Sequence, residues 1–236
     1  MADRTLPPLG GEQGRPGAGG EDRRPGTGGE DGRAALGLHE AATRYGAYRW
    51  VERRLFEITG AWAAAASLPD EAQVFCFEVS TQHAWHAELW GARMPVLAGV
   101  DRERLTRPLG PTVEPLLARL APGTLGGTGE GAGRRFLVGL ARVVLPLLLV
   151  SYRGLGRRLA PVADAAAVRA LTLVLRDEEE ELAAAQAIVD ALLDTPEAAQ
   201  EAAEWARELD EPALQLALQS EENDGLLPWS EPNAAW

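Results

Sequence analysis

The chain has 236 residues and a formal net charge of -12, and all of its non-histidine basic residues are arginine because it contains no lysine. This acidic balance opposes non-specific binding to nucleic-acid phosphates, which needs a basic face. Alanine, leucine, glutamate and arginine are abundant, which favours helices over strands, so we expect an all-α protein.

The N-terminal stretch repeats a nine-residue unit rich in glycine and proline, with almost nothing apolar to bury. Such a stretch cannot offset the entropy of ordering the chain. We therefore predict a disordered tail over residues 1–35, one helical domain over residues 36–220 and a partly ordered C-terminal tail over residues 221–236. The first residues also lack the apolar core of a secretory signal, and Cys76 is the single cysteine, so we expect a cytoplasmic protein.

The first helix is predicted over residues 38–66. Its apolar stripe follows spacings of three and four residues through Tyr45, Tyr48, Glu52, Leu55, Phe56, Thr59 and Trp62. Glu52 lies on this stripe, where an ionised carboxylate needs a metal, a histidine or an arginine as its partner. Glu57 has arginines one turn before it and is expected to face water.

The second helix is predicted from about residue 67 to residue 90 and contains the segment FCFEVSTQHAWHAELW. His83 and His86 are three residues apart and share one face. That face favours either one metal ion or a network of hydrogen bonds in the core. Trp85 and Trp90 are predicted to belong to the core.

Residues 94–111 are predicted to form a connection and residues 113–120 a short helix, followed by a glycine-rich crossover loop over residues 122–133. The third helix, residues 135–159, is the most hydrophobic part of the chain. Because Arg142 interrupts it, we predict a buried helix and no membrane span. Pro146 is expected to kink this helix. Its apolar centre has no carboxylate and offers only Ser151 and Tyr152 as polar groups.

The fourth helix is predicted from about residue 162 or 164 to residue 193. Glu178 lies on its apolar face and Glu181 lies one turn further on, whereas Glu179 and Glu180 are expected to be solvated. A shorter acidic helix is predicted over residues 196–209, with one further helical turn over residues 212–219.

The segments QHAWHAELW and RDEEEEL resemble the second-helix and fourth-helix motifs of the ferritin-like superfamily, including its rubrerythrin-type and bacterial di-iron members. The resemblance implies a ferritin-like four-helix bundle with a crossover connection and an extra C-terminal helix. It also implies a set of metal ligands: Glu52, His83, His86, Glu178 and Glu181. The chain departs from the motifs at His83, where glutamate is usual, at Glu181, where histidine is usual, and in the third helix, which lacks a carboxylate.

Two hypotheses follow for the function. In the first, the resemblance implies one or two non-haem iron ions and an iron- and oxygen-dependent oxidase or oxygenase that acts on a small organic substrate. In the second, the bundle has lost its metal and serves as a scaffold that binds a protein partner or a second copy of itself. Neither hypothesis involves nucleic acid or a membrane.

Overall fold

The computed structural model of the chain describes residues 36–65, 67–108, 110–125 and 129–222. Every regular element among these residues is helical, which confirms the all-α prediction. The elements are α1 (Leu38–Ala63), α2 (Asp70–Arg93), α3 (Arg102–Leu105), α4 (Val113–Ala118), α5 (Glu130–Gly139), the π-helix η1 (Leu140–Val144), α6 (Leu145–Arg158), α7 (Ala165–Leu192) and α8 (Pro196–Glu222). The predicted disordered tail lies outside the described residues, as does the predicted C-terminal tail from residue 223 onward.

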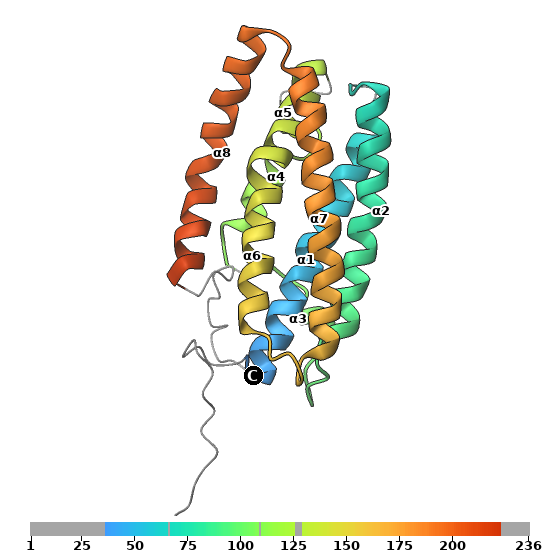
Figure 1. Cartoon of the computed structure of the whole chain (residues 1–236), viewed down its shortest axis with the longest axis vertical. Coiled ribbons are helices and arrows are strands. Elements are labelled where there is room, and N and C mark those ends of the chain that lie inside the picture. Colours follow the sequence, from blue (N-terminus) through green and yellow to red (C-terminus); the bar gives the residue numbers. More distant parts are fainter. Residues whose placement is uncertain (1–35, 66, 109, 126–128, 223–236) are drawn as a thin grey trace, which may run out of the picture. The chain divides into compact units, whose positions relative to one another are not determined.

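The long helices lie side by side (Figure 1). Helix α1 packs along α2, α2 packs against α7, and α7 packs against α6. Helix α8 covers α5, η1 and α4 on the outside. The shared interior contains large aromatic side chains with no exposed surface: Tyr48, Trp62, Trp90, Phe136 and Tyr152. Burial of each such side chain contributes about 1.5–3 kcal/mol to folding.

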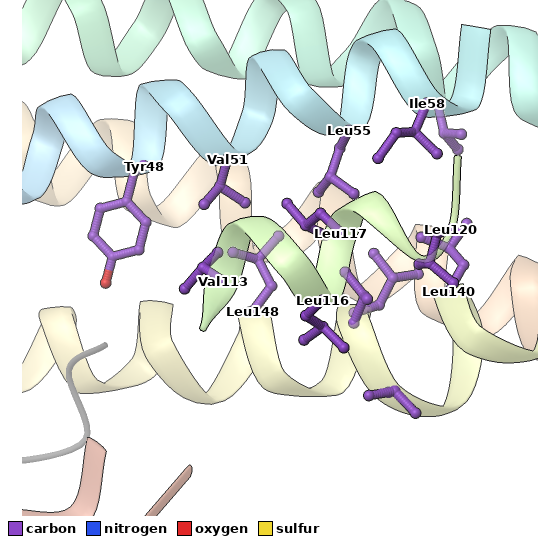
Figure 2. Close-up of a cluster of buried hydrophobic side chains, with 14 of the residues drawn as sticks. Tyr48, Val51, Leu55, Ile58, Val113, Leu116, Leu117, Leu120, Leu140 and Leu148 are labelled. Atoms are coloured by element: carbon purple, nitrogen blue, oxygen red, sulfur yellow. The ribbon is translucent and has the colours of Figure 1, made fainter. Parts of the chain in front are cut away.

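Helix α4 fills the space between α1 and the continuous η1–α6 segment. Figure 2 shows its apolar side chains packed between those of the two longer elements: Val113, Leu116 and Leu117 among Val51, Leu55, Leu140 and Leu148. The indole Nε1 of Trp62 donates a hydrogen bond to the backbone carbonyl of Leu120 at 2.7 Å. This bond ties the end of the α4 segment to α1 and satisfies a polar atom in an otherwise apolar region.

A π-helix lies shortly before Pro146, the residue at which a kink was predicted. Proline has no N–H to donate to the carbonyl of Arg142, four residues earlier, and its ring crowds that carbonyl. The wider turn of η1, Leu140–Val144, contains Arg142, ends two residues before Pro146 and accommodates this clash. Residues Gly131–Arg158 are long and apolar enough to cross a membrane, but 72% of the most apolar stretch is buried inside the protein, which fits a soluble protein.

Several predicted boundaries shift. Helix α1 ends at Ala63, α2 continues past Gly91 to Arg93, and α5 begins at Glu130, inside the predicted crossover loop. The predicted break before residue 212 is wrong, because α8 is continuous to Glu222. Pro212 deprives the Glu208 carbonyl of its helical donor, and Nη1 of Arg119 donates to that carbonyl instead at 2.8 Å.

Two side chains predicted to be buried are exposed. Phe56 is 44% exposed and Trp85 is 45% exposed. Successive residues of a helix differ by about 100° in direction. Phe56 therefore points away from the direction of the fully buried Leu55, and Trp85 points away from the direction shared by the buried His83 and His86. Glu57 faces water as predicted, paired with Arg54 at 2.7 Å.

Candidate metal centre

Three helices turn a histidine or a carboxylate toward one point in the core. Glu52 comes from α1, His83 and His86 from α2, and Glu178 from α7. One nitrogen or oxygen atom of each side chain lies within 4.8 Å of the others, and none of the four residues has exposed surface. The structure thus brings together four of the five residues that the resemblance implied as ligands.

The fifth residue, Glu181, lies beside this group. Residues three apart on a helix share a face, so Glu181 follows Glu178 into the core and is 3% exposed. Its Oε1 lies 3.2 Å from Nε2 of His83, on the other side of that ring from Glu52. Glu181 is not among the four residues whose ligand atoms lie within 4.8 Å of one another. Glu78, two turns before His86, is exposed.

His83 lies between carboxylates from two helices. Its Nδ1 is 2.7 Å from Oε2 of Glu52, which is a hydrogen bond, and 3.6 Å from Oε1 of Glu178. Because both ring nitrogens face carboxylates, the protonated, positively charged form of the His83 ring is favoured. This contact connects α1, α2 and α7 at the level of the site.

His86 is oriented by a carboxylate outside the group of four. Its Nε2 lies 3.4 Å from Oδ2 of Asp177, and the other oxygen of Asp177 accepts from Arg176 at 2.9 Å. An Nε2–H that donates to Asp177 leaves Nδ1 of the neutral ring with its lone pair. That Nδ1 lies 3.3 Å from Glu178 and 3.6 Å from Glu52. In the neutral form of His86 the lone pair of Nδ1 therefore faces the centre, as a metal ligand must.

Helix α6 contributes Tyr152, which was noted in the sequence only as a polar residue in an apolar helix. The side chain has no exposed surface, and its hydroxyl donates a hydrogen bond to Oε1 of Glu52. Nε1 of Trp90 donates to the same hydroxyl oxygen at 3.2 Å. Burial raises the pKa of Tyr152 well above its ordinary value, and the charges of Glu52 and Glu178 raise it further. Tyr152 is therefore a neutral hydrogen-bond donor at physiological pH.

The buried carboxylates and histidines shift one another's pKa values, and the two glutamates of the group shift in opposite directions. Burial raises the pKa of Glu178, and the charges of Glu52 and Glu181 raise it further. Burial also raises the pKa of Glu52, but the charges of His86 and His83 and the hydrogen bond with His83 outweigh burial and lower it. Burial lowers the pKa of His86, but Glu52 and Glu178 outweigh it and raise the value to about 10. The pKa of His83 is likewise raised, despite burial, by Glu181 and Glu52. Without metal, protons neutralise the cluster.

The donor atoms of the cluster fit a metal ion. Buried polar atoms are normally hydrogen-bonded, yet six buried atoms here have no such partner: Nε2 of His83, Nδ1 of His86, and both carboxylate oxygens of Glu178 and of Glu181. The 3.2 Å approach of His83 to Glu181 is close enough for attraction but is not aligned as a hydrogen bond. Two carboxylates and two neutral imidazoles balance the charge of one divalent cation, and this mixed set suits first-row transition ions such as iron and zinc.

Comparisons with known proteins do not assign the chain to a family. No family model, curated protein or solved structure matches it. The geometry and chemistry of the site are therefore the guide to its function.

Proposed function

We propose that this protein binds non-haem iron, as one or two ions, through Glu52, His83, His86 and Glu178, with Glu181 as a further ligand. The observation that carries this proposal is the convergence of buried ligand atoms, several of them without a hydrogen-bond partner, from three helices. A cluster of this kind is costly in a dry core unless a cation or protons compensate its charge.

The architecture we propose is a ferritin-like four-helix bundle made of α1, α2, the α5–η1–α6 segment and α7. The order of the ligands supports it, because a lone carboxylate on the first helix precedes paired ligands on the second, and paired ligands recur on α7. Helices α3 and α4 lie in the long connection between α2 and α5, which corresponds to the crossover, and α8 is the extra C-terminal helix.

The reaction we propose is an oxygen-dependent oxidation or hydroxylation of a small organic substrate in the cytoplasm. Iron held by imidazoles and carboxylates, with coordination positions left open, supplies the chemistry of dioxygen activation. The chain's own residues hold and orient the site: Asp177 fixes the ring of His86, Tyr152 holds Glu52, and the surrounding aromatic side chains exclude bulk water.

Metal analysis of protein purified without chelator from iron-supplemented cells tests the proposal. We expect stoichiometric iron in the wild type and its loss in His86→Ala and Glu178→Ala. His39→Ala and Glu180→Ala are matched controls, because both residues are exposed, and they should retain the metal. Oxygen consumption after anaerobic loading with ferrous iron then tests the reaction. Wild-type protein that binds neither iron nor another transition metal would refute the proposal.

The competing function is that of a metal-free scaffold. The 2.7 Å hydrogen bond between His83 and Glu52 favours it, because the cluster partly satisfies itself. In that case His83→Gln and Glu52→Gln would preserve folding and leave the metal content at zero, as in the wild type. A protein partner or a second copy of the chain would then be sought by co-purification from the native host.

A further inference from the structure

Tyr152 lies where α6 meets the candidate metal centre. Its ring is sandwiched in an aromatic cluster, 4.7 Å from the ring centre of Tyr48 and 5.6 Å from that of Trp90, with an interplanar angle of 16° to the indole. Its hydroxyl bonds to Glu52 and Trp90. The ring therefore has a fixed position, and the hydroxyl has two defined partners.

The direction of these hydrogen bonds follows from the chemistry of the groups. An indole N–H is only a donor, so the hydroxyl oxygen of Tyr152 accepts from Trp90. An ionised carboxylate is only an acceptor, so the phenolic proton points at Oε1 of Glu52. A relay of donors thus runs from Trp90 through Tyr152 to one chosen oxygen of Glu52.

The two carboxylate oxygens of Glu52 have different partners. Oε1 accepts from Tyr152, whereas Oε2 is the oxygen that lies 2.7 Å from His83 and 3.6 Å from Nδ1 of His86. Only Oε2 therefore faces the histidines and is available to a cation at the centre. A carboxylate bridge that uses one oxygen for each of two metal ions would need Oε1 as well, and Tyr152 holds that oxygen.

We propose that Tyr152 is a positioning residue that holds Glu52 with a single oxygen toward the centre, and that its neutral phenol, where a second ion would need a carboxylate, limits the site to one metal ion. The inference rests on the proposed metal binding and goes beyond it by fixing the number of ions. Full charge balance of two divalent ions would need a fourth carboxylate beside Glu52, Glu178 and Glu181, and α6 supplies the neutral phenol of Tyr152 there instead.

Cobalt(II) is a suitable probe, because its visible absorption weakens as its coordination number increases. Wild-type protein stripped of metal and titrated with cobalt should bind one ion per chain. Tyr152→Phe keeps the ring but frees Oε1, so we expect one ion with weaker visible bands and an affinity reduced by about 10- to 100-fold, the usual effect of losing a partner that orients a ligand. Tyr152→Glu supplies the missing carboxylate and should raise the count toward two ions.

Tyr48→Phe is the matched control. Tyr48 is also fully buried and packs on Tyr152. The substitution likewise removes one hydroxyl, but this hydroxyl bonds to Ser151 rather than to a candidate ligand. It should change stability without changing the cobalt spectrum, the affinity or the count.

Three results would overturn the inference while leaving metal binding intact: two ions in the wild type, a Tyr152→Phe protein whose cobalt spectrum and affinity match those of Tyr48→Phe, or a folded Tyr152→Glu protein that still binds one ion. If Tyr152→Glu does not fold, the comparison between the two phenylalanine variants decides. A wild type that binds no cobalt, iron or zinc would instead overturn the proposed function, and this inference with it.

Discussion

Glu178→Gln should stabilise the metal-free protein and at the same time weaken or abolish its metal binding. In the absence of a cation, the Glu178 carboxyl is fully buried beside the carboxylates of Glu52 and Glu181. Glutamine has the shape of the protonated acid but can never ionise. The substitution therefore removes an electrostatic cost of the empty cluster together with a ligand that a metal would need.

The expected size follows from the pKa of Glu178, which is raised from 4.5 to about 8. The folded protein holds this proton more tightly than the unfolded chain does, so the group favours folding most below its unfolded pKa, and that contribution is lost as the pH rises toward 8. Near neutral pH the unfolded chain has lost the proton while the folded protein keeps it. A gap of about 2.5 pH units at about 1.36 kcal/mol each gives a cost of roughly 3 kcal/mol.

Denaturant unfolding of chelator-treated protein, measured at several pH values between 5 and 8, provides the assay. The free energy of unfolding of Glu178→Gln should exceed that of the wild type by roughly 3 kcal/mol near pH 7, and the difference should grow with pH. Metal at about a thousand times its Kd should reverse the order, since at that concentration it adds about 4.1 kcal/mol to the wild type alone. Glu180→Gln, at an exposed position of the same helix, should match the wild type throughout.

The reasoning would be refuted by a metal-free Glu178→Gln protein that is less stable than the wild type near pH 7. It would also be refuted by a stability difference that does not change with pH. The first result would mean that attraction to the histidines outweighs burial and the repulsion between carboxylates, and the second that these effects cancel.

Three further predictions concern the orientation of a ligand, proton release and helix packing. Asp177→Ala should weaken metal binding about 10- to 100-fold, because His86 loses the partner that orients its ring. Competition with a chelator measures the affinity. Asp190 is exposed, and Asp190→Ala should leave the affinity unchanged. Metal binding should release protons and strengthen as the pH rises toward 10, because the pKa of His86 is raised to about 10 and a metal must displace the proton of its ring. Calorimetry in buffers with different ionisation enthalpies would show the proton release. A metal affinity that does not depend on pH would contradict the prediction. Gly46→Ala should lower the free energy of unfolding by about 1–3 kcal/mol, because a Cβ at this position meets the backbone carbonyl of Leu105 and α3 must move. Unchanged stability in denaturant would show that the close approach of α1 to α3 is not required.

Much of the fold could be predicted because helix formation depends on local patterns. The three- and four-residue spacing on α1 and α7, and the composition of the chain, were enough to predict helices close to their observed bounds. The continuity of α8 through Pro212 could not be predicted in this way. There the donor that the proline lacks is supplied to the Glu208 carbonyl by Arg119, 89 residues earlier than Glu208.

The candidate site was also predictable in part. A separation of three residues places His83 beside His86 and Glu178 beside Glu181 whatever else the chain does, since it follows from the helical repeat. The burial of Glu52 followed from its place on an apolar stripe. The exposure of Trp85 was not predicted. Residue 85 points away from the helix face that His83 and His86 share, and that this face is the buried one is evident only from the tertiary structure.

By itself, the sequence determined the helices and which polar side chains share a face, because both depend on neighbours within a few residues. Only the tertiary structure decided which faces meet. It brought Glu52 within 2.7 Å of His83, placed Asp177 behind His86 and set the hydroxyl of Tyr152 against one oxygen of Glu52. These contacts join residues 31, 91 and 100 positions apart, and they are fixed by how the helices pack rather than by any local pattern.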